Sequence, residues 1–156
     1  MKHYIDPKTK EISAYEEDGS QDTFIKDGLI PISDEELAEL KKPTLDESKP
    51  QKVNDINLFC STEITGGFDY NGYRYDSGIE DQINLMGAAS MGIDLPFKCK
   101  KLSNGVKEFY PHTAAQLKAV VIAGAQFKMR ILEKATTLKA KANQAATVKE
   151  LEAIKW

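Results

Sequence analysis

The residues whose types could support catalysis or metal binding are few and lie far apart. The two histidines, His3 and His112, are separated by most of the chain, and no HxxH, HExxH or paired CxxC spacing occurs. A metal site needs three or four converging ligands, and nucleophilic catalysis needs a base beside the nucleophile. We therefore expect no enzyme activity, no metal and no cofactor, and we expect both histidines to be surface or helix-capping side chains.

The cysteines and the main acidic group also favour structural roles. Cys60 and Cys99 have no partner spacing, so we expect reduced thiols that pack as small hydrophobic side chains. No GxxxxGK[ST] or GxGxxG phosphate-binding motif is present. The acidic group lacks the spacing of a calcium-binding EF-hand loop and is typical of solvated surface and helix capping. It consists of Asp69, Asp76, Glu80 and Asp81.

Length and composition allow one compact domain, or one domain with a small additional lobe. The chain has 156 residues, of which 41% are hydrophobic and 29% charged, and its net charge is -3. That charge argues against nucleic-acid binding, which needs a basic face. No apolar run is long enough for a membrane span, and no signal peptide is visible. Residues 1–50 are acidic, with 7 Lys/Arg and 13 Asp/Glu, whereas residues 113–156 are basic, with 8 and 3.

The pattern predicts an α+β fold with a small β-rich lobe at residues 1–42. Two β-compatible runs flank the turn-forming residues 6–10, and Ser33 with Glu36 has the spacing of a capping box that opens a short helix. Pro43 should end that helix. Residues 43–52 contain two prolines and one large apolar side chain, which predicts a flexible linker. A helical domain with two β-hairpins is then expected over residues 53–156.

The strongest local signal in this second domain is a β-hairpin at residues 68–75. Asn71-Gly72 is the preferred pair for a two-residue type I′ turn, which pairs Asp69 with Arg74. Because strand side chains alternate between faces, the four hairpin aromatics should share one face. That face either packs on neighbouring helices or binds a partner. The four aromatics are Phe68, Tyr70, Tyr73 and Tyr75.

Two further elements are expected between this hairpin and the C-terminal region. Ser77 and Glu80 should form a capping box, and the apolar spacing predicts a helix with its inner face on Ile79, Ile83, Met86, Ser90 and Ile93. A second hairpin should pair residues 97–102 with 106–110. Its loop has either two or three residues, so its register stays open.

A long helix is predicted from Thr113 onward, followed by a short last helix after Thr147. The apolar stripe of the long helix steps by three and four residues, with one break of the heptad at Ala135. This stripe either folds back on its own domain or forms a coiled coil with a second chain. With Tyr4 and Tyr15 of the first lobe added, the candidate partner-binding residues are Tyr4, Tyr15, Phe68, Tyr70, Tyr73, Tyr75, Leu117, Val120, Phe127 and Ile131.

Two regions carry a resemblance to a known family. Residues 4–7, 14–22 and 25–32 resemble the N-terminus of caudoviral (phage or prophage) tail-fibre assembly proteins. Residues 68–75, the helix at 79–91, residues 113–117 and residues 147–154 resemble an uncharacterised domain of phage tail-associated proteins. The resemblance implies a tail-fibre assembly chaperone or fibre-associated factor, with no catalytic residues to carry over.

This resemblance sets the expected partners and location. The partner would be a phage tail-fibre protein, and we also expect a homodimer, with neither nucleic acid nor membrane as a partner. The protein would act in the host bacterial cytoplasm during virion assembly. The alternative is a permanent structural component of the virion tail, and an enzyme is the third hypothesis.

Overall fold

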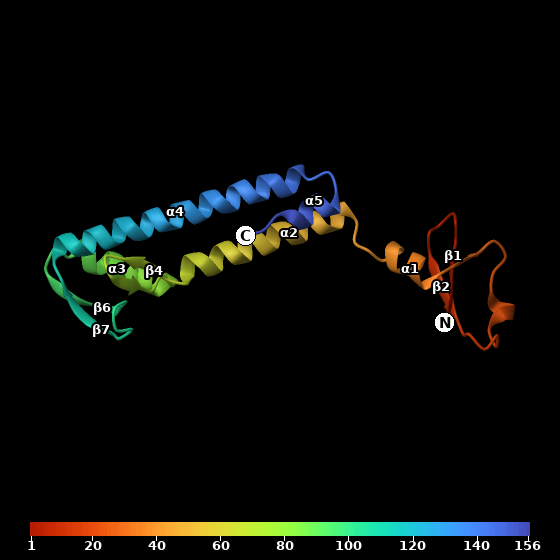
Figure 1. Cartoon of the computed structure of the whole chain (residues 1–156), viewed down its shortest axis with the longest axis horizontal. Helices are drawn as coiled ribbons and strands as arrows, with labels where there is room; N and C mark the ends of the chain where they lie inside the picture. The colour runs from red at the N-terminus through yellow and green to blue at the C-terminus, as the bar shows by residue number, and fades with distance from the viewer. The chain divides into compact units, whose positions relative to one another are not determined.

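The chain divides into two compact units in the computed structural model, which describes all 156 residues (Figure 1). Unit 1 comprises Met1–Thr44 and unit 2 comprises Leu45–Trp156. The fold is α+β, with an N-terminal β-rich lobe and a long C-terminal helix, as the sequence predicted.

Unit 1 contains a three-stranded antiparallel sheet in the order β2-β1-β3. The carboxylate of Asp6 accepts hydrogen bonds from the backbone N–H groups of Lys8 and Thr9, which fixes the turn of the first hairpin. The predicted capping box between Ser33 and Glu36 is present at the start of α1. The elements are β1 (Lys2–Ile5), β2 (Ile12–Tyr15), a 3-10 turn (Asp22–Phe24), β3 (Ile30–Ile32) and α1 (Asp34–Leu40).

The predicted flexible linker at residues 43–52 is wrong over most of its length, because helix α2 spans Leu45–Thr65. Thr44 and Glu47 have capping-box spacing, which favours a helix start here despite Pro50. Tertiary contacts hold these turns: Lys49 and Lys52 donate hydrogen bonds to the backbone carbonyls of Asn143 and Ile154, near the other end of the chain. Composition alone could not reveal those distant acceptors.

Unit 2 contains a four-stranded antiparallel sheet in the order β4-β5-β6-β7. The hairpin at residues 68–75 has the predicted register, and Asn71 and Gly72 both have the positive φ of a type I′ turn. In the second hairpin Lys101 N–H bonds to Val106 C=O and Gly105 N–H to Lys101 C=O, so residues 102–105 form a loop longer than either predicted length. The strands are β4 (Phe68–Tyr70), β5 (Tyr73–Tyr75), β6 (Leu95–Lys101) and β7 (Lys107–His112).

Helix α3 (Ile79–Ser90) differs from its prediction in cap and in face. Gly78 takes the capping position, and Asp81 accepts its backbone N–H. The hydroxyl of Ser77 is already engaged, since it accepts from Gly67 N–H and donates to Ile64 C=O. The buried face carries Leu85 and Ala89, whereas the predicted inner face is exposed. Those exposed residues are Ile79, Ile83, Met86, Ser90 and Ile93.

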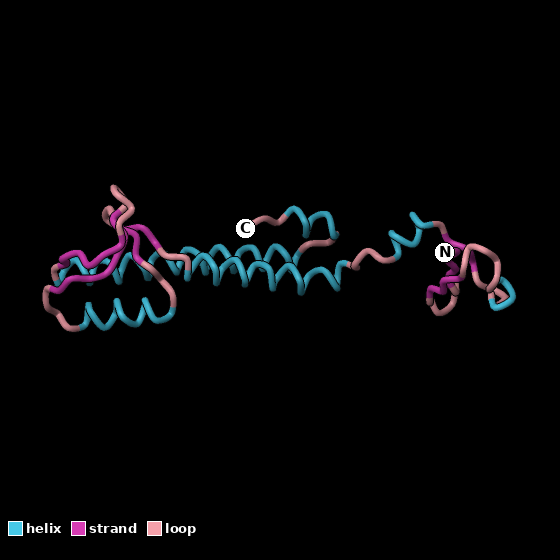
Figure 2. The backbone as a smooth tube through the Cα atoms, turned by 90° about the horizontal axis from the view of Figure 1, so that it is seen from below, coloured by secondary structure: helices cyan, strands magenta, loops and turns pink.

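Helix α4 (Ala114–Gln144) is the element on which both clusters of the unit 2 core pack. Its N-terminal half packs on α3 and the sheet, and its C-terminal half packs on α2 and α5 (Val148–Ala153). Figures 1 and 2 show α2 and α4 side by side, with the sheet at one end of the pair. Phe127 contacts both clusters and so joins them.

Candidate functional site

The two candidate tyrosines of unit 1 lie on adjacent strands and contact each other. The rings of Tyr4 and Tyr15 meet edge to face with centroids 5.6 Å apart. The hydroxyl of Tyr15 donates to Phe24 C=O at 3.4 Å, which attaches the 3-10 turn to the sheet. Both side chains are half-buried, so each offers a partner only part of its ring.

The four aromatics of the β4–β5 hairpin divide between core and surface. Phe68 and Tyr75 are buried, and the Phe68 ring stacks between those of Tyr75 and Phe127. Tyr73 is half-buried beside them, and only Tyr70 is exposed. The packing alternative therefore holds for most of this face. On the opposite face Arg74 pairs with Asp69 at 2.8 Å.

The predicted stripe of α4 forms the inner face of this helix. Leu117, Val120 and Ile131 are buried within unit 2, which excludes them from a partner surface in this structure and corrects that assignment. Phe127 is half-buried between the two core clusters. The spacing located the apolar face correctly, but the chain itself covers it.

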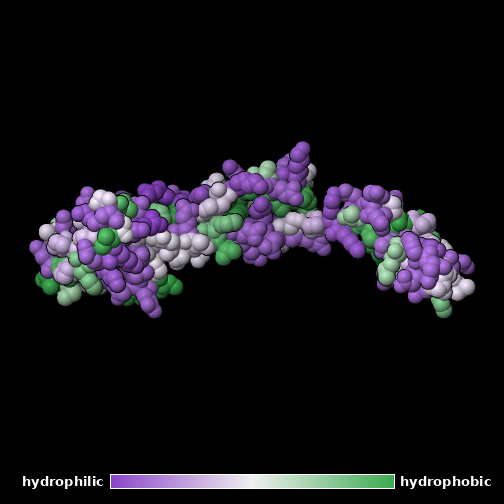
Figure 3. All heavy atoms as spheres, turned by 60° about the horizontal axis from the view of Figure 1, so that its bottom comes forward, coloured by the Kyte–Doolittle hydropathy of each residue, from purple (hydrophilic) through white to green (hydrophobic).

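Two other helix faces in unit 2 are apolar and uncovered. On α3 the exposed face includes Ile79, with 74% of its surface accessible, together with Ile83 and Met86. On α4 the outer face carries Ile122 and Met129, which are 59% and 55% exposed. Figure 3 shows hydrophobic residues reaching the surface among hydrophilic ones. Apolar area of this kind marks contact surfaces more often than does a single exposed side chain.

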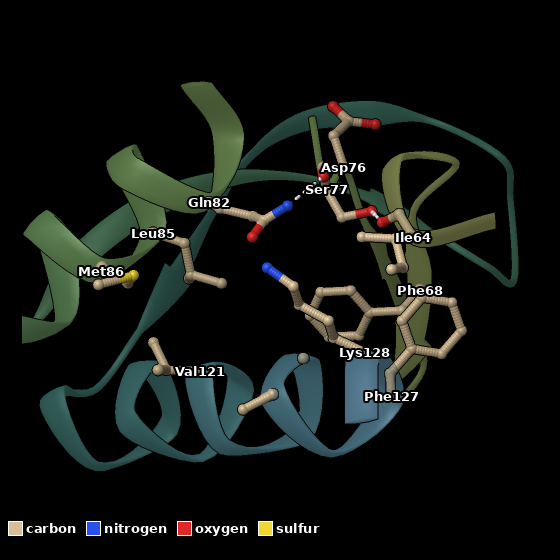
Figure 4. Close-up of a pocket in the computed structure, with 12 residues that line it drawn as sticks. Ile64, Phe68, Asp76, Ser77, Gln82, Leu85, Met86, Val121, Phe127 and Lys128 are labelled. Atoms are coloured by element: carbon tan, nitrogen blue, oxygen red, sulfur yellow. Dashed lines mark hydrogen bonds between the residues drawn. The ribbon is translucent and has the colours of Figure 1, made fainter. Parts of the chain in front are cut away.

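A cleft of about 220 Å³ lies between α3 and α4 (Figure 4). Leu85 and Val121 give it apolar walls, and Phe68 and Phe127 lie at one end. The side chain of Lys128 extends toward the Gln82 side of the cleft, and the Gln82 amide donates to Ser77 C=O. The cleft has room for an apolar side chain beside a polar rim.

His112 is buried and forms hydrogen bonds to two aromatic residues of the sheet, so it is neither a surface nor a capping side chain as predicted. The hydroxyl of Tyr75 lies 2.9 Å from His112 Nε2, and His112 Nδ1 lies 2.8 Å from Tyr110 C=O. Because the Tyr110 carbonyl can only accept, Nδ1 donates to it, while Nε2 is bonded to the Tyr75 hydroxyl. His112 thereby attaches the end of β7 to β5.

Burial also determines the protonation state of two neighbouring groups. It raises the pKa of the Tyr75 phenol and of the Cys99 thiol above their ordinary values. Cys99 is therefore a neutral thiol near pH 7 and lacks the thiolate character of a reactive cysteine. Both cysteines are free and buried, as predicted.

Unit 1 has very little interior. Leu37 is its only buried hydrophobic residue, while Phe24 is 72% exposed and Ile30 and Leu40 are about half exposed (50% and 51%). Of the charged residues in Met1–Thr44, 11 are acidic and 6 basic. The surface of unit 1 thus combines exposed apolar side chains with negative charge.

Neither a metal-binding group of side chains nor a membrane-spanning helix is present. No three His, Cys, Asp or Glu side chains come together in a group that could hold a metal ion. None of the helices combines the length and the apolar composition that a membrane span requires.

Unit 2 is a domain that combines packed helices with a four-stranded antiparallel sheet, and its sequence matches a known family. Residues 47–155 match the family described as "Domain of unknown function (DUF4376)", and the chain belongs to this family. The match covers almost all of unit 2 and none of unit 1. Searches of curated proteins and of solved structures gave no match.

Proposed function

We propose that this chain is a phage tail-fibre assembly chaperone or fibre-associated factor that acts by binding proteins. Unit 1 would contact the tail-fibre protein, and the helices of unit 2 would join two copies of the chain. The action would take place in the host bacterial cytoplasm during virion assembly. The resemblance of residues 4–7, 14–22 and 25–32 to tail-fibre assembly proteins supports this class.

The observation that carries the proposal is that unit 1 buries almost no hydrophobic core. A lobe of 44 residues is close to the size below which chains usually need disulfides, metals or association to stay folded. Contact with another protein would cover Phe24, Ile30 and Leu40, which unit 1 leaves exposed. Its excess of acidic residues favours a partner with a basic contact surface.

Co-expression with the tail-fibre protein of the same genome tests this function. We expect the chain to raise the soluble, trimeric yield of the fibre, and Phe24→Ala combined with Leu40→Ala to reduce that gain. Leu58→Ala is the matched control, because Leu58 is similarly exposed but lies on α2 of unit 2. A fibre that gains nothing from the unaltered chain would contradict the proposal. Mass spectrometry of purified particles would show whether the chain stays in the tail.

A further inference from the structure

The outer face of α4 combines exposed apolar side chains with two unpaired charges of opposite sign. Ile122, Ala125 and Met129 lie along it, with Lys118 before them and Glu133 after them. At 3.6 residues per turn these five positions fall on one side of the helix, opposite the buried stripe. Neither Lys118 nor Glu133 takes part in an ion pair or hydrogen bond within the chain.

We propose that this face binds a second copy of the same chain, with the two α4 helices antiparallel about a two-fold axis level with Ala125 and Gln126. Ile122 lies three residues before Ala125, and Met129 lies three residues after Gln126. The two-fold therefore sets each Ile122 opposite Met129 of the other copy. The small side chain of Ala125 at the crossing allows close approach of the helices.

The charges select this orientation. Lys118 lies seven residues before Ala125 and Glu133 seven residues after Gln126, so the same axis places each Lys118 opposite Glu133 of the other copy. A parallel pair in register would set lysine against lysine and glutamate against glutamate instead. The face is thus complementary to itself only in the antiparallel orientation, which is the symmetry of an isologous dimer.

The apolar contact has a suitable receiving surface. Ile122, Ala125 and Met129 line a shallow hollow on α4, together with Gln126, Arg130 and Glu133. Side chains of a facing helix can enter such a hollow as knobs enter holes in a coiled coil. This interface deepens the proposed function, because it assigns the self-association of unit 2 to named residues. Fibre binding is assigned to unit 1, so either part can fail alone.

Charge reversal and sedimentation of the full chain test the interface. We expect a concentration-dependent dimer whose Kd rises about threefold to tenfold in Lys118→Glu and in Glu133→Lys, because each variant opposes like charges twice. The double variant, Lys118→Glu with Glu133→Lys, should return the Kd to near that of the unaltered chain. Ile122→Asp should give a monomer of unchanged helix content, since Ile122 is outside the core.

Disulfide trapping checks the geometry independently. Ala125→Cys lies next to the axis and should cross-link two copies, whereas Lys118→Cys lies about 22 Å along the helix from its own counterpart and should not. The native Cys60 and Cys99 are buried and do not compete. A chain that stays monomeric at high concentration overturns the proposal. A dimer whose Kd is unchanged by the charge reversals also overturns it, and so does one that cross-links at residue 118 but not at 125. Either result would mean that another surface or another protein covers this face.

Discussion

At the scale of single residues, α4 packs closely against the β4–β5 hairpin at Gly124. A Cβ atom placed on Gly124 would lie 2.9 Å from Cζ of the Phe68 ring. That ring cannot move away easily, because it is stacked against Tyr75 and Phe127. Glycine inside a helix is unfavourable, but at this position it lets the aromatic ring approach the helix backbone.

Gly124→Ala should therefore destabilise the protein in spite of the better helix propensity of alanine. We expect the free energy of unfolding to fall by about 1–3 kcal/mol, the usual effect of overpacking a core. Gly87→Ala in α3 is the control, since no atom lies within 4 Å of its added Cβ. That variant should gain about 0.5–1 kcal/mol. Thermal or urea unfolding measures both, and equal effects at the two positions would contradict the packing described here.

The buried contact between Tyr75 and His112 gives a second prediction. Tyr75→Phe removes the hydroxyl that bonds to His112 Nε2 and leaves this nitrogen without a partner. We expect a loss of about 1–3 kcal/mol, the cost of an unsatisfied buried polar group. Tyr70→Phe on the same hairpin is the matched control, because Tyr70 is exposed, and it should change stability by less than about 0.5 kcal/mol. Denaturant unfolding that fails to separate the two variants would rule out the proposed role of His112.

At the scale of elements, most strong local signals in the sequence predicted their elements correctly, although Gly78 rather than Ser77 caps α3 and the start of α2 was missed. The Asn71-Gly72 turn specified the register of its hairpin, and the N-cap residues Ser33, Thr113 and Thr147 marked real helix starts. At Thr147 the box is incomplete, because Glu150 accepts from Ala146 N–H instead. These signals work because the interacting groups lie within a few residues of one another.

Face assignments were harder, because periodicity identifies an apolar stripe but not what covers it. α3 has two such stripes, and the one with larger side chains is exposed, while Leu85 and Ala89 pack on α4. The small side chains of Ala88 and Ala89 let the two helices approach closely at that end of the contact. For the same reason the candidate residues Leu117, Val120 and Ile131 were found on the correct face, but that face lies inside the unit.

The N-terminal turns of α2 give a prediction at this scale. If residues 45–52 are helical and held by the Lys49 and Lys52 contacts, the backbone amides of residues 51–56 should exchange slowly with solvent. Hydrogen–deuterium exchange with peptide resolution measures this, and residues 26–29 of unit 1 provide a fast-exchanging reference. Equal, rapid exchange in the two segments would restore the original linker interpretation.

At the scale of the whole chain, the two units differ sharply in how much they bury. Unit 2 has two hydrophobic clusters joined through Phe127, whereas unit 1 has one buried hydrophobic residue. Stability within one chain need not be uniform, and weakly packed regions open first. The unit with the smaller core is also the one to which we assign fibre binding.

Limited trypsin digestion should reveal this difference. Lysines of unit 1 are expected to be cut first, and the stable product should begin at Lys42, since trypsin does not cleave before Pro43. Lys52 should be protected, because its side chain is bonded to Ile154 C=O and its backbone is helical. Mass spectrometry of the early products measures the order of cleavage. Cleavage after Lys52 at the same rate as after Lys26 would contradict the assignment of separate stabilities.

The central claim is that separate exposed surfaces of this chain bind separate proteins, and the mass of its complex with the tail-fibre protein tests it most directly. Light scattering on the purified mixture should give a complex containing two copies of the chain. Phe24→Ala with Leu40→Ala should leave the dimer but release the fibre, and Ile122→Asp should leave the fibre bound to single copies. A mixture in which the chain and the fibre elute as unassociated species at every concentration would contradict the account.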